Sequence, residues 1–299
     1  MASEDADQIA ARIAQKLRDA GGSAILYPRT ATTLGALRRD RVVVVVSLTL
    51  LAALAWSYLL WLSVDMGMGG MDMTGFRMIP AGTGLMMPVH TPWAMEFAFV
   101  FAMWTVMMVG MMTPSAMPMI LMYARFGRYA EPEGTPLVAT VWFVAGYFLV
   151  WVAFALLATL VQWALERTAL LDSAMAGTSN VLGGLVFVTA GSYQWTRLKD
   201  VCLTQCQMPF AFLMRHGGFR RDVLGCLLLG LRHGAYCVGC CWALMVLLFV
   251  GGVMNLLWIV LLSLLIFLEK VTFLGRQIAP LAGIVLIAAG AWLLSMGMS

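Results

Sequence analysis

The chain has 299 residues, of which 62% are hydrophobic and only 11% are charged. This composition excludes an ordinary soluble domain, in which about 25% of the residues are charged, and indicates an integral membrane protein. The formal net charge of +4 does not indicate nucleic-acid binding, because the basic residues are distributed as a membrane topology requires.

Seven apolar segments predict an all-α, polytopic transmembrane helix bundle. Most have about the 20 residues that a helix needs to cross hydrocarbon, although the fourth and sixth are short. The segments are residues 42–62, 93–112, 137–163, 180–196, 223–250, 254–268 and 278–296. Residues 1–41 are then a cytoplasmic tail with a short amphipathic helix, and residues 42–299 form a single transmembrane domain. The tail is too long and too charged for a signal peptide, so we read the first span as an uncleaved anchor.

The distribution of Lys and Arg predicts the orientation. With the amino terminus inside, 16 of the 19 basic residues fall in cytoplasmic segments. Seven precede the first span, two are Arg125 and Arg128, five lie between Arg197 and Arg221, and two are Lys270 and Arg276. The carboxyl terminus is therefore expected outside.

The second span contains Pro114 and Pro118 in the string "MMTPSAMPM". Proline removes a helix donor and frees a carbonyl, so we expect the span to kink there or to end there at the inner rim.

The fifth span contains "LRHGAYCVGCCWALM", residues 231–245, which places soft and ionisable side chains in an apolar segment. On a helix, His233, Cys237 and Cys240 fall within about 60° of one another, and Cys241 lies about 40° beyond them. Neighbouring members are one turn apart, so adjacent thiolates could share a metal ion. Because ionisable groups within a membrane are usually functional, we predict a metal or redox site on this face.

Three further cysteines predict a lower group nearer the cytoplasm. Cys202 and Cys206 stand at positions i and i+4 of the inner loop "KDVCLTQCQMP", and Cys226 precedes His233 by about 10 Å along the fifth helix. All six cysteines lie at this rim or in the fifth span, where reduced thiols are expected.

Methionine usage points to copper. Of the 24 methionines, 16 lie between Met66 and Met122, in the outer loop and the second span. Thioether and thiolate ligands select Cu(I), whereas Zn(II) competes where four Cys or His ligands close a tetrahedron. The predicted donors from other helices are Met107, Met111, Met112 and Tyr193. Core filling is the alternative role for the Met stripe.

Arg232 adjoins the cluster, about 15 Å into its span. Two roles are open: its charge stabilises nearby thiolates, or it pairs with an acidic residue such as Glu269. Glu269 and Lys270 themselves are expected to mark the inner end of the sixth span.

Several strings resemble the bacterial DUF2182 family of predicted metal-binding integral membrane proteins: "MMTPSAMPM" followed by "YARF", "GSYQWTRLKDVCLTQCQMPFAFL", and "GLRHGAYCVGCCWALMVLLFVGGVMNLLW" followed by "EK". The resemblance covers about residues 93–296 and implies metal binding in a bacterial inner membrane. Its motif residues here are Tyr193, Gln194, Lys199, Cys202, Cys206, His233, Tyr236, Cys237, Cys240, Cys241 and Asn255.

The favoured function is copper handling, in which Cu(I) bound by the intramembrane His and Cys cluster crosses the lipid bilayer or passes to a partner cuproprotein. Neither a P-loop nor a phosphorylation-type Asp motif is visible, which favours a carrier or assembly factor over a pump. Two alternatives remain. One is a thiol-disulfide or quinone oxidoreductase that uses the pair Cys237 and Cys240, and the other is a scaffold subunit with structural zinc.

Overall fold

The structure is a computed structural model that describes residues 31–65, 93–130, 136–167, 180–220, 222–253, 255–272 and 274–298. These residues form helices and their connections, with no strand among them, which confirms the predicted all-α class. The expected amphipathic helix of the tail and the Met-rich outer loop at residues 66–92 lie outside the described residues.

An apolar helix stands at each of the seven predicted positions. The helices are α3 (Ala31–Asp65), α4 (Trp93–Ala130), α5 (Pro136–Arg167), α6 (Asn180–Tyr193), α9 (Val223–Val246), α11 (Leu256–Val271) and α12 (Gly275–Met298). Five apolar stretches are long enough to cross a membrane, in α3, α4, α5, α12 and α9 with its continuation. The helices α6 and α11 have only 14 and 16 residues, as the short fourth and sixth segments indicated.

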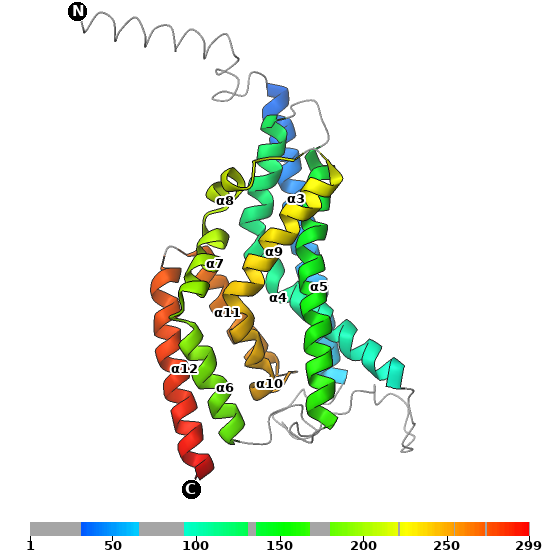
Figure 1. Ribbon diagram of the computed structural model, residues 1–299. Coiled ribbons are helices and arrows are strands. Elements are labelled where there is room, and N and C mark those ends of the chain that lie inside the picture. The colour runs from blue at the N-terminus through cyan, green and yellow to red at the C-terminus, as the bar shows by residue number, and fades with distance from the viewer. Residues whose placement is uncertain are drawn as a thin grey trace, which may run out of the picture.

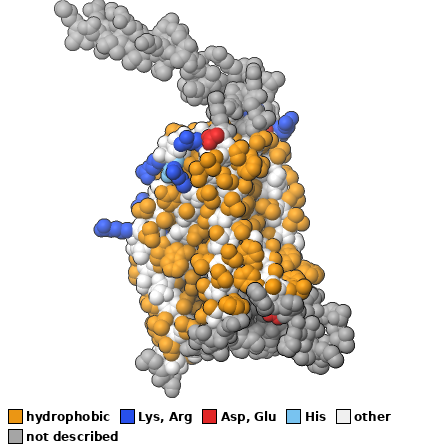
Figure 2. Space-filling view, turned by 45° about the vertical axis from the view of Figure 1, so that its right-hand side comes forward, with side chains coloured by type: hydrophobic (Ala, Val, Ile, Leu, Met, Phe, Trp, Pro, Cys, Tyr) orange, Lys and Arg blue, Asp and Glu red, His pale blue; other side chains and the backbone are white. Residues whose placement is uncertain are grey.

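The first and last described helices reach opposite ends of the bundle. In Figure 1, α3 begins at the upper end and α12 finishes at the lower end, next to the carboxyl terminus. Figure 2 shows Lys and Arg side chains gathered toward the upper part of the visible face and a broad apolar band around the body. Leu54, Val141 and Val285 are 69%, 64% and 66% exposed. Such outward apolar faces suit contact with acyl chains.

The second predicted span does not end at its prolines. The helix α4 runs 38 residues, with Pro114 and Pro118 inside it, and changes direction along its length in Figure 1. The hydroxyls of Thr113 and Ser115 donate to carbonyls of the preceding turn, at 2.6 Å and 3.0 Å. Packing against neighbouring helices and local hydroxyl bonds allow a helix to continue past proline in a bundle. Of the two expectations for this span, a kink fits the structure, and an end of the helix at the prolines is wrong.

The segment expected to be an inner loop is helical. It forms α7 (Arg197–Gln207) and α8 (Pro209–Arg215), and α7 packs against α9. Thr196 caps α7 because its hydroxyl accepts a bond from the backbone N–H of Lys199 at 3.3 Å. Pro209, at the start of α8, lacks the N–H that would continue α7. The two cysteines of α7 are thereby placed against the bundle.

Small residues bring the helices close together. The helices α5 and α9 are in contact, and a Cβ added at Gly230 would collide with the carbonyl oxygen of Phe143. The helices α6 and α12 form another close pair, in which a Cβ at Gly191 would lie 2.8 Å from the carbonyl oxygen of Gly283. Close backbone approach of this kind is typical of membrane helices.

The helix α11 is short and buries two charged residues in its last turn. After α10 (Leu248–Gly251), the chain turns at Gly252, whose φ is +89°, and the side chain of Asn255 caps α11. Its 16 residues span about 24 Å, which is less than the roughly 30 Å of a hydrocarbon core. Its last turn contacts α7, α9 and α4, and it buries Glu269 and Lys270 there.

Candidate metal centre

The predicted ligand face of α9 points into the protein. His233, Cys237, Cys240 and Cys241 are 3%, 2%, 1% and 1% exposed. Their spacing on one helix face is responsible, because a residue and its neighbours at i+3 and i+4 share a side of the helix. The four side chains therefore lie inside the bundle, as a site on this face would require.

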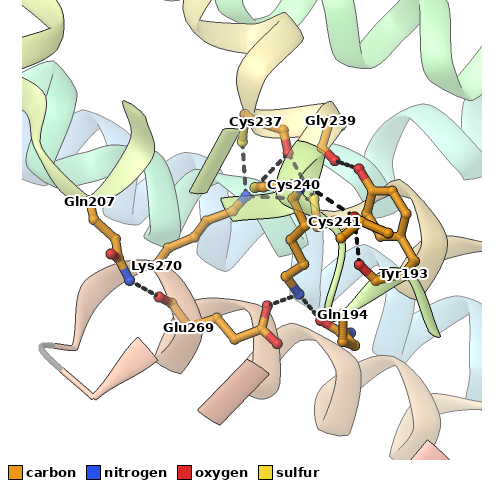
Figure 3. Close-up of polar contacts among 11 residues, drawn as sticks. Tyr193, Gln194, Gln207, Cys237, Gly239, Cys240, Cys241, Glu269 and Lys270 are labelled. Carbon is orange, nitrogen blue, oxygen red and sulfur yellow. Dashed lines mark hydrogen bonds and ion pairs between the residues drawn. The ribbon is translucent and has the colours of Figure 1, made fainter. Parts of the chain in front are cut away.

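A buried lysine lies among the sulfur atoms. The amine of Lys270 is 2.9 Å from the sulfur of Cys237 and 3.6 Å from that of Cys241. The thioether sulfur of Met112 lies 3.8 Å from the same amine. Figure 3 shows Lys270 extending toward Cys237 and Cys241, while the neighbouring Glu269 turns toward Gln194. Three helices, α4, α9 and α11, therefore contribute to one cluster.

Tyrosines bound the cluster on two sides. The hydroxyl of Tyr147 on α5 lies 3.1 Å from the sulfur of Cys237. The hydroxyl of Tyr193, a predicted donor, instead donates to the carbonyl oxygen of Gly239 at 2.5 Å, as Figure 3 shows. Tyr193 thus links α6 to α9 beside the thiols, and its hydroxyl is hydrogen-bonded to the backbone of α9.

The two cysteines of α7 lie at the level of this cluster. The thiol of Cys206 is near enough to those of Cys237 and Cys240 to influence them electrostatically, although Cys206 itself is only half-buried. The sulfur of Cys202 lies 2.8 Å from the position that a Cβ on Gly239 would take. The structure therefore adds Cys206 to the α9 cluster, with Cys202 close to it.

Cys226 does not join them. Its thiol donates to the carbonyl oxygen of Arg220 at 3.3 Å and receives a hydrogen bond from the hydroxyl of Tyr123 at 3.3 Å. The lower group predicted from Cys202, Cys206 and Cys226 is not formed. The reason is that α7 folds back along α9 and carries its cysteines away from the end where Cys226 lies.

His233 is enclosed by aromatic rings. The rings of Phe212, Tyr147 and Phe143 have centroids 5.2 Å, 5.7 Å and 6.0 Å from that of His233. Its Nδ1 atom is buried and has no hydrogen-bond partner. A buried imidazole nitrogen without a partner is free to bind a metal ion.

The methionines of α4 occupy the core. Met107, Met111 and Met112 are at most 1% exposed. Of these predicted donors, Met112 is the one whose sulfur has a polar contact with the cluster, through Lys270.

Neither predicted role of Arg232 is supported, because its side chain is on the exposed side of α9. Glu269 pairs instead with Lys199, at 2.7 Å, and both side chains are almost fully buried. The amine of Lys199 also donates to the side-chain oxygen of Gln194. Glu269 and Lys270 are therefore buried inside the protein, although they stand in the last turn of α11.

Lys270, Lys199 and Tyr147 were missed as members of the polar interior. The motif of the resemblance did include Lys199.

The thiols are not arranged around a common point. The sulfurs of Cys240 and Cys241 both donate to the carbonyl oxygen of Cys237, each at 3.0 Å. Within the described ranges, no group of three or more His, Cys, Asp or Glu side chains is positioned to hold a metal ion. A site using these residues would require the thiols to rotate away from the backbone.

A bundle of apolar helices that buries a cluster of thiols with a methionine defines a membrane-embedded protein with donors for a soft metal. The comparison with known families indicates which metal is involved. Residues 101–293, nearly two-thirds of the chain, match the PpoB2 family, described as a copper chaperone, and the chain belongs to this family. No curated protein and no solved structure matches it. The predicted link to copper is confirmed at this level.

Proposed function

We propose that this chain binds Cu(I) within the membrane and delivers it to a partner cuproprotein. The observation that carries the proposal is the buried cluster of three cysteines of α9 with Met112 from α4, beside the half-buried Cys206 of α7. Thiolate and thioether sulfur together select Cu(I) over harder ions. Membership of a copper-chaperone family supports the same cargo.

The proposed donors are the thiolates of Cys237 and Cys241 and the thioether of Met112, with the neutral thiols of Cys240 and Cys206 and the imidazole of His233 near them. Rotation of the Cys241 thiol away from the carbonyl of Cys237 gives up one hydrogen bond. Donors that must rearrange before they bind hold their ligand less tightly than preorganised ones. Weaker holding suits a chaperone, which has to release its cargo.

We place the route of entry along α4. Met103, Met107 and Met111 lie along this helix toward its amino-terminal end, which is the lower end in Figure 1. We propose that the amino terminus of the chain lies on the cytoplasmic side of a bacterial inner membrane. The amino-terminal end of α4 then faces the outside. Thioethers stay neutral and tolerate an oxidising compartment better than thiols, so copper would pass from Met-rich outer segments to the thiols.

The thiol oxidoreductase remains a second candidate, because Cys206 interacts with both members of the pair Cys237 and Cys240. In that function a quinone would accept two electrons and two protons as two thiols form a disulfide. Structural zinc has less support, because such sites hold four ligands in a closed tetrahedron.

The test is anaerobic Cu(I) titration of the purified protein in detergent, against a chromogenic Cu(I) chelator. The wild type is expected to withdraw Cu(I) from the chelator, and the triple variant Cys237→Ser, Cys240→Ser, Cys241→Ser is expected to lose this ability. The matched control is Cys226→Ser, which should bind as the wild type does. Equal Cu(I) stoichiometry in the triple variant and the wild type would overturn the proposal.

A further inference from the structure

Lys270 places a cationic group where a metal ion would have to bind. Its amine contacts three sulfur atoms, those of Cys237, Cys241 and Met112, at 2.9 Å, 3.6 Å and 3.8 Å. The ring of Trp151 lies on another side, with its centroid 6.0 Å from the nitrogen. The residue is 5% exposed. The space shared by these three sulfurs is therefore occupied by a cation that belongs to the chain.

The charge of this amine is not matched by a carboxylate. The ion pairs of the described part of the chain are Arg128 with Asp40 and Lys199 with Glu269, and neither involves Lys270. An uncompensated charge in a buried site costs several kcal/mol. The ionisable groups that its amine contacts are the thiols of Cys237 and Cys241, which are also proposed metal donors.

We propose that Lys270 sets the charge balance of the site and thereby selects a monovalent over a divalent metal ion. This inference rests on the copper function proposed above. Lys270 acts as a specificity determinant that does not itself bind the metal: its amine moves aside for the incoming ion and stays next to the sulfurs.

The arithmetic of charge explains the selection. Bound through the thiolates of Cys237 and Cys241 and the neutral thioether of Met112, Cu(I) gives a complex of charge −1, which the ammonium of Lys270 brings to zero. Zn(II) with the same donors gives a neutral complex, and Lys270 then leaves a buried charge of +1. Each bound thiol loses its proton to solvent as the metal–sulfur bond forms. A buried net charge is disfavoured, so the site prefers Cu(I).

A neutral side chain at this position reverses the preference. With Lys270→Met, the Cu(I) complex carries an unbalanced −1 and the Zn(II) complex is neutral. The ratio of Cu(I) to Zn(II) affinity is expected to fall by at least about tenfold, since each unbalanced buried charge costs more than 1.4 kcal/mol. Lys270→Arg keeps the charge and should hold the ratio within about threefold of the wild type.

The experiment measures Cu(I) and Zn(II) affinities separately, each against a competing chelator, in purified wild type, Lys270→Met and Lys270→Arg. Lys270→Gln repeats the loss of charge with a polar side chain, for the case that the Met variant is poorly folded. A folding defect lowers both affinities together, whereas the proposal requires their ratio to change. A wild type that binds Cu(I) with a ratio unchanged in both neutral variants overturns this inference alone. A wild type that binds no Cu(I) overturns the proposed function and this inference with it.

Discussion

The amine of Lys270 lies 2.9 Å from the sulfur of Cys237, and the two residues belong to different helices. The contact joins the end of the short helix α11 to the middle of α9. The hydroxyl of Tyr147, on α5, approaches the same sulfur at 3.1 Å, and Met112 of α4 lies 3.8 Å from the amine. The thiol cluster is therefore a junction of helices, and its geometry depends on how they pack.

The position of Cys206 beside the α9 cluster, and not beside Cys226, can be tested directly. Its thiol interacts with Cys237 and Cys240, whereas the thiol of Cys226 is bonded to Arg220 and Tyr123. We expect Cys206→Ser to weaken Cu(I) binding by about tenfold, or about 1.4 kcal/mol, because it removes a thiol that lies beside the donor sulfurs. Cys226→Ser should leave the affinity unchanged. Competition with a Cu(I) chelator measures both, and the reverse ranking would contradict the assignment of Cys206 to the α9 cluster.

The thioether of Met112 is expected to contribute to copper binding. Met112→Leu keeps the apolar volume and removes the sulfur, so stability should change by less than about 1.5 kcal/mol. Cu(I) affinity should nevertheless fall. The control is Met119→Leu, about two turns further along the same helix and 2% exposed. Equal Cu(I) affinities in the two variants would remove Met112 from the donor set.

The pair formed by Lys199 and Glu269 should respond strongly to the loss of one partner. The atoms lie 2.7 Å apart, with side chains 1% and 2% exposed. Glu269→Gln leaves the lysine charge buried and unpaired, which typically costs about 3–5 kcal/mol. The double variant Lys199→Met, Glu269→Met removes both charges and should recover most of that loss. Thermal or denaturant unfolding in detergent compares the variants, and an unaffected Glu269→Gln would show that the pair is not a stabilising contact.

Close packing of α5 on α9 predicts a sharp difference between two glycines. A Cβ at Gly230 collides with the carbonyl oxygen of Phe143, while a Cβ at Gly35 meets nothing within 4 Å. Gly230→Ala should separate the helices and lower the melting temperature. Gly35→Ala should be neutral or stabilising by up to about 1 kcal/mol, because alanine favours a helix. Similar melting temperatures for both variants would contradict the described approach of α5 and α9.

The sequence alone was sufficient for the apolar helices and for the inward face of α9. Helical periodicity placed His233, Cys237 and Cys240 on one side, and that spacing does not depend on neighbouring helices. The five long apolar stretches and the two short helices α6 and α11 stand where hydropathy predicts them. Local composition carries this information because membrane helices must be apolar over a fixed length.

The errors share a tertiary cause. Lys199 and Lys270 were counted among the cytoplasmic basic residues, yet they are 0% and 5% exposed. In the sequence, a charged residue at the end of an apolar segment gives the same pattern whether its side chain faces solvent or packs inside the protein. The packing of α7 along α9 determines whether Lys199 is buried. The same packing brings Cys206 to the α9 cluster and away from Cys226. Nothing local in the string of α7 specifies that packing.

X-ray absorption of the purified, copper-loaded protein tests the central claim most directly. The account predicts a copper edge typical of Cu(I) and a first coordination shell dominated by sulfur. In the triple variant Cys237→Ser, Cys240→Ser, Cys241→Ser, this sulfur shell should disappear. A first shell of nitrogen and oxygen alone in the wild type, or a sulfur shell that persists in the triple variant, would contradict copper binding at the α9 thiols.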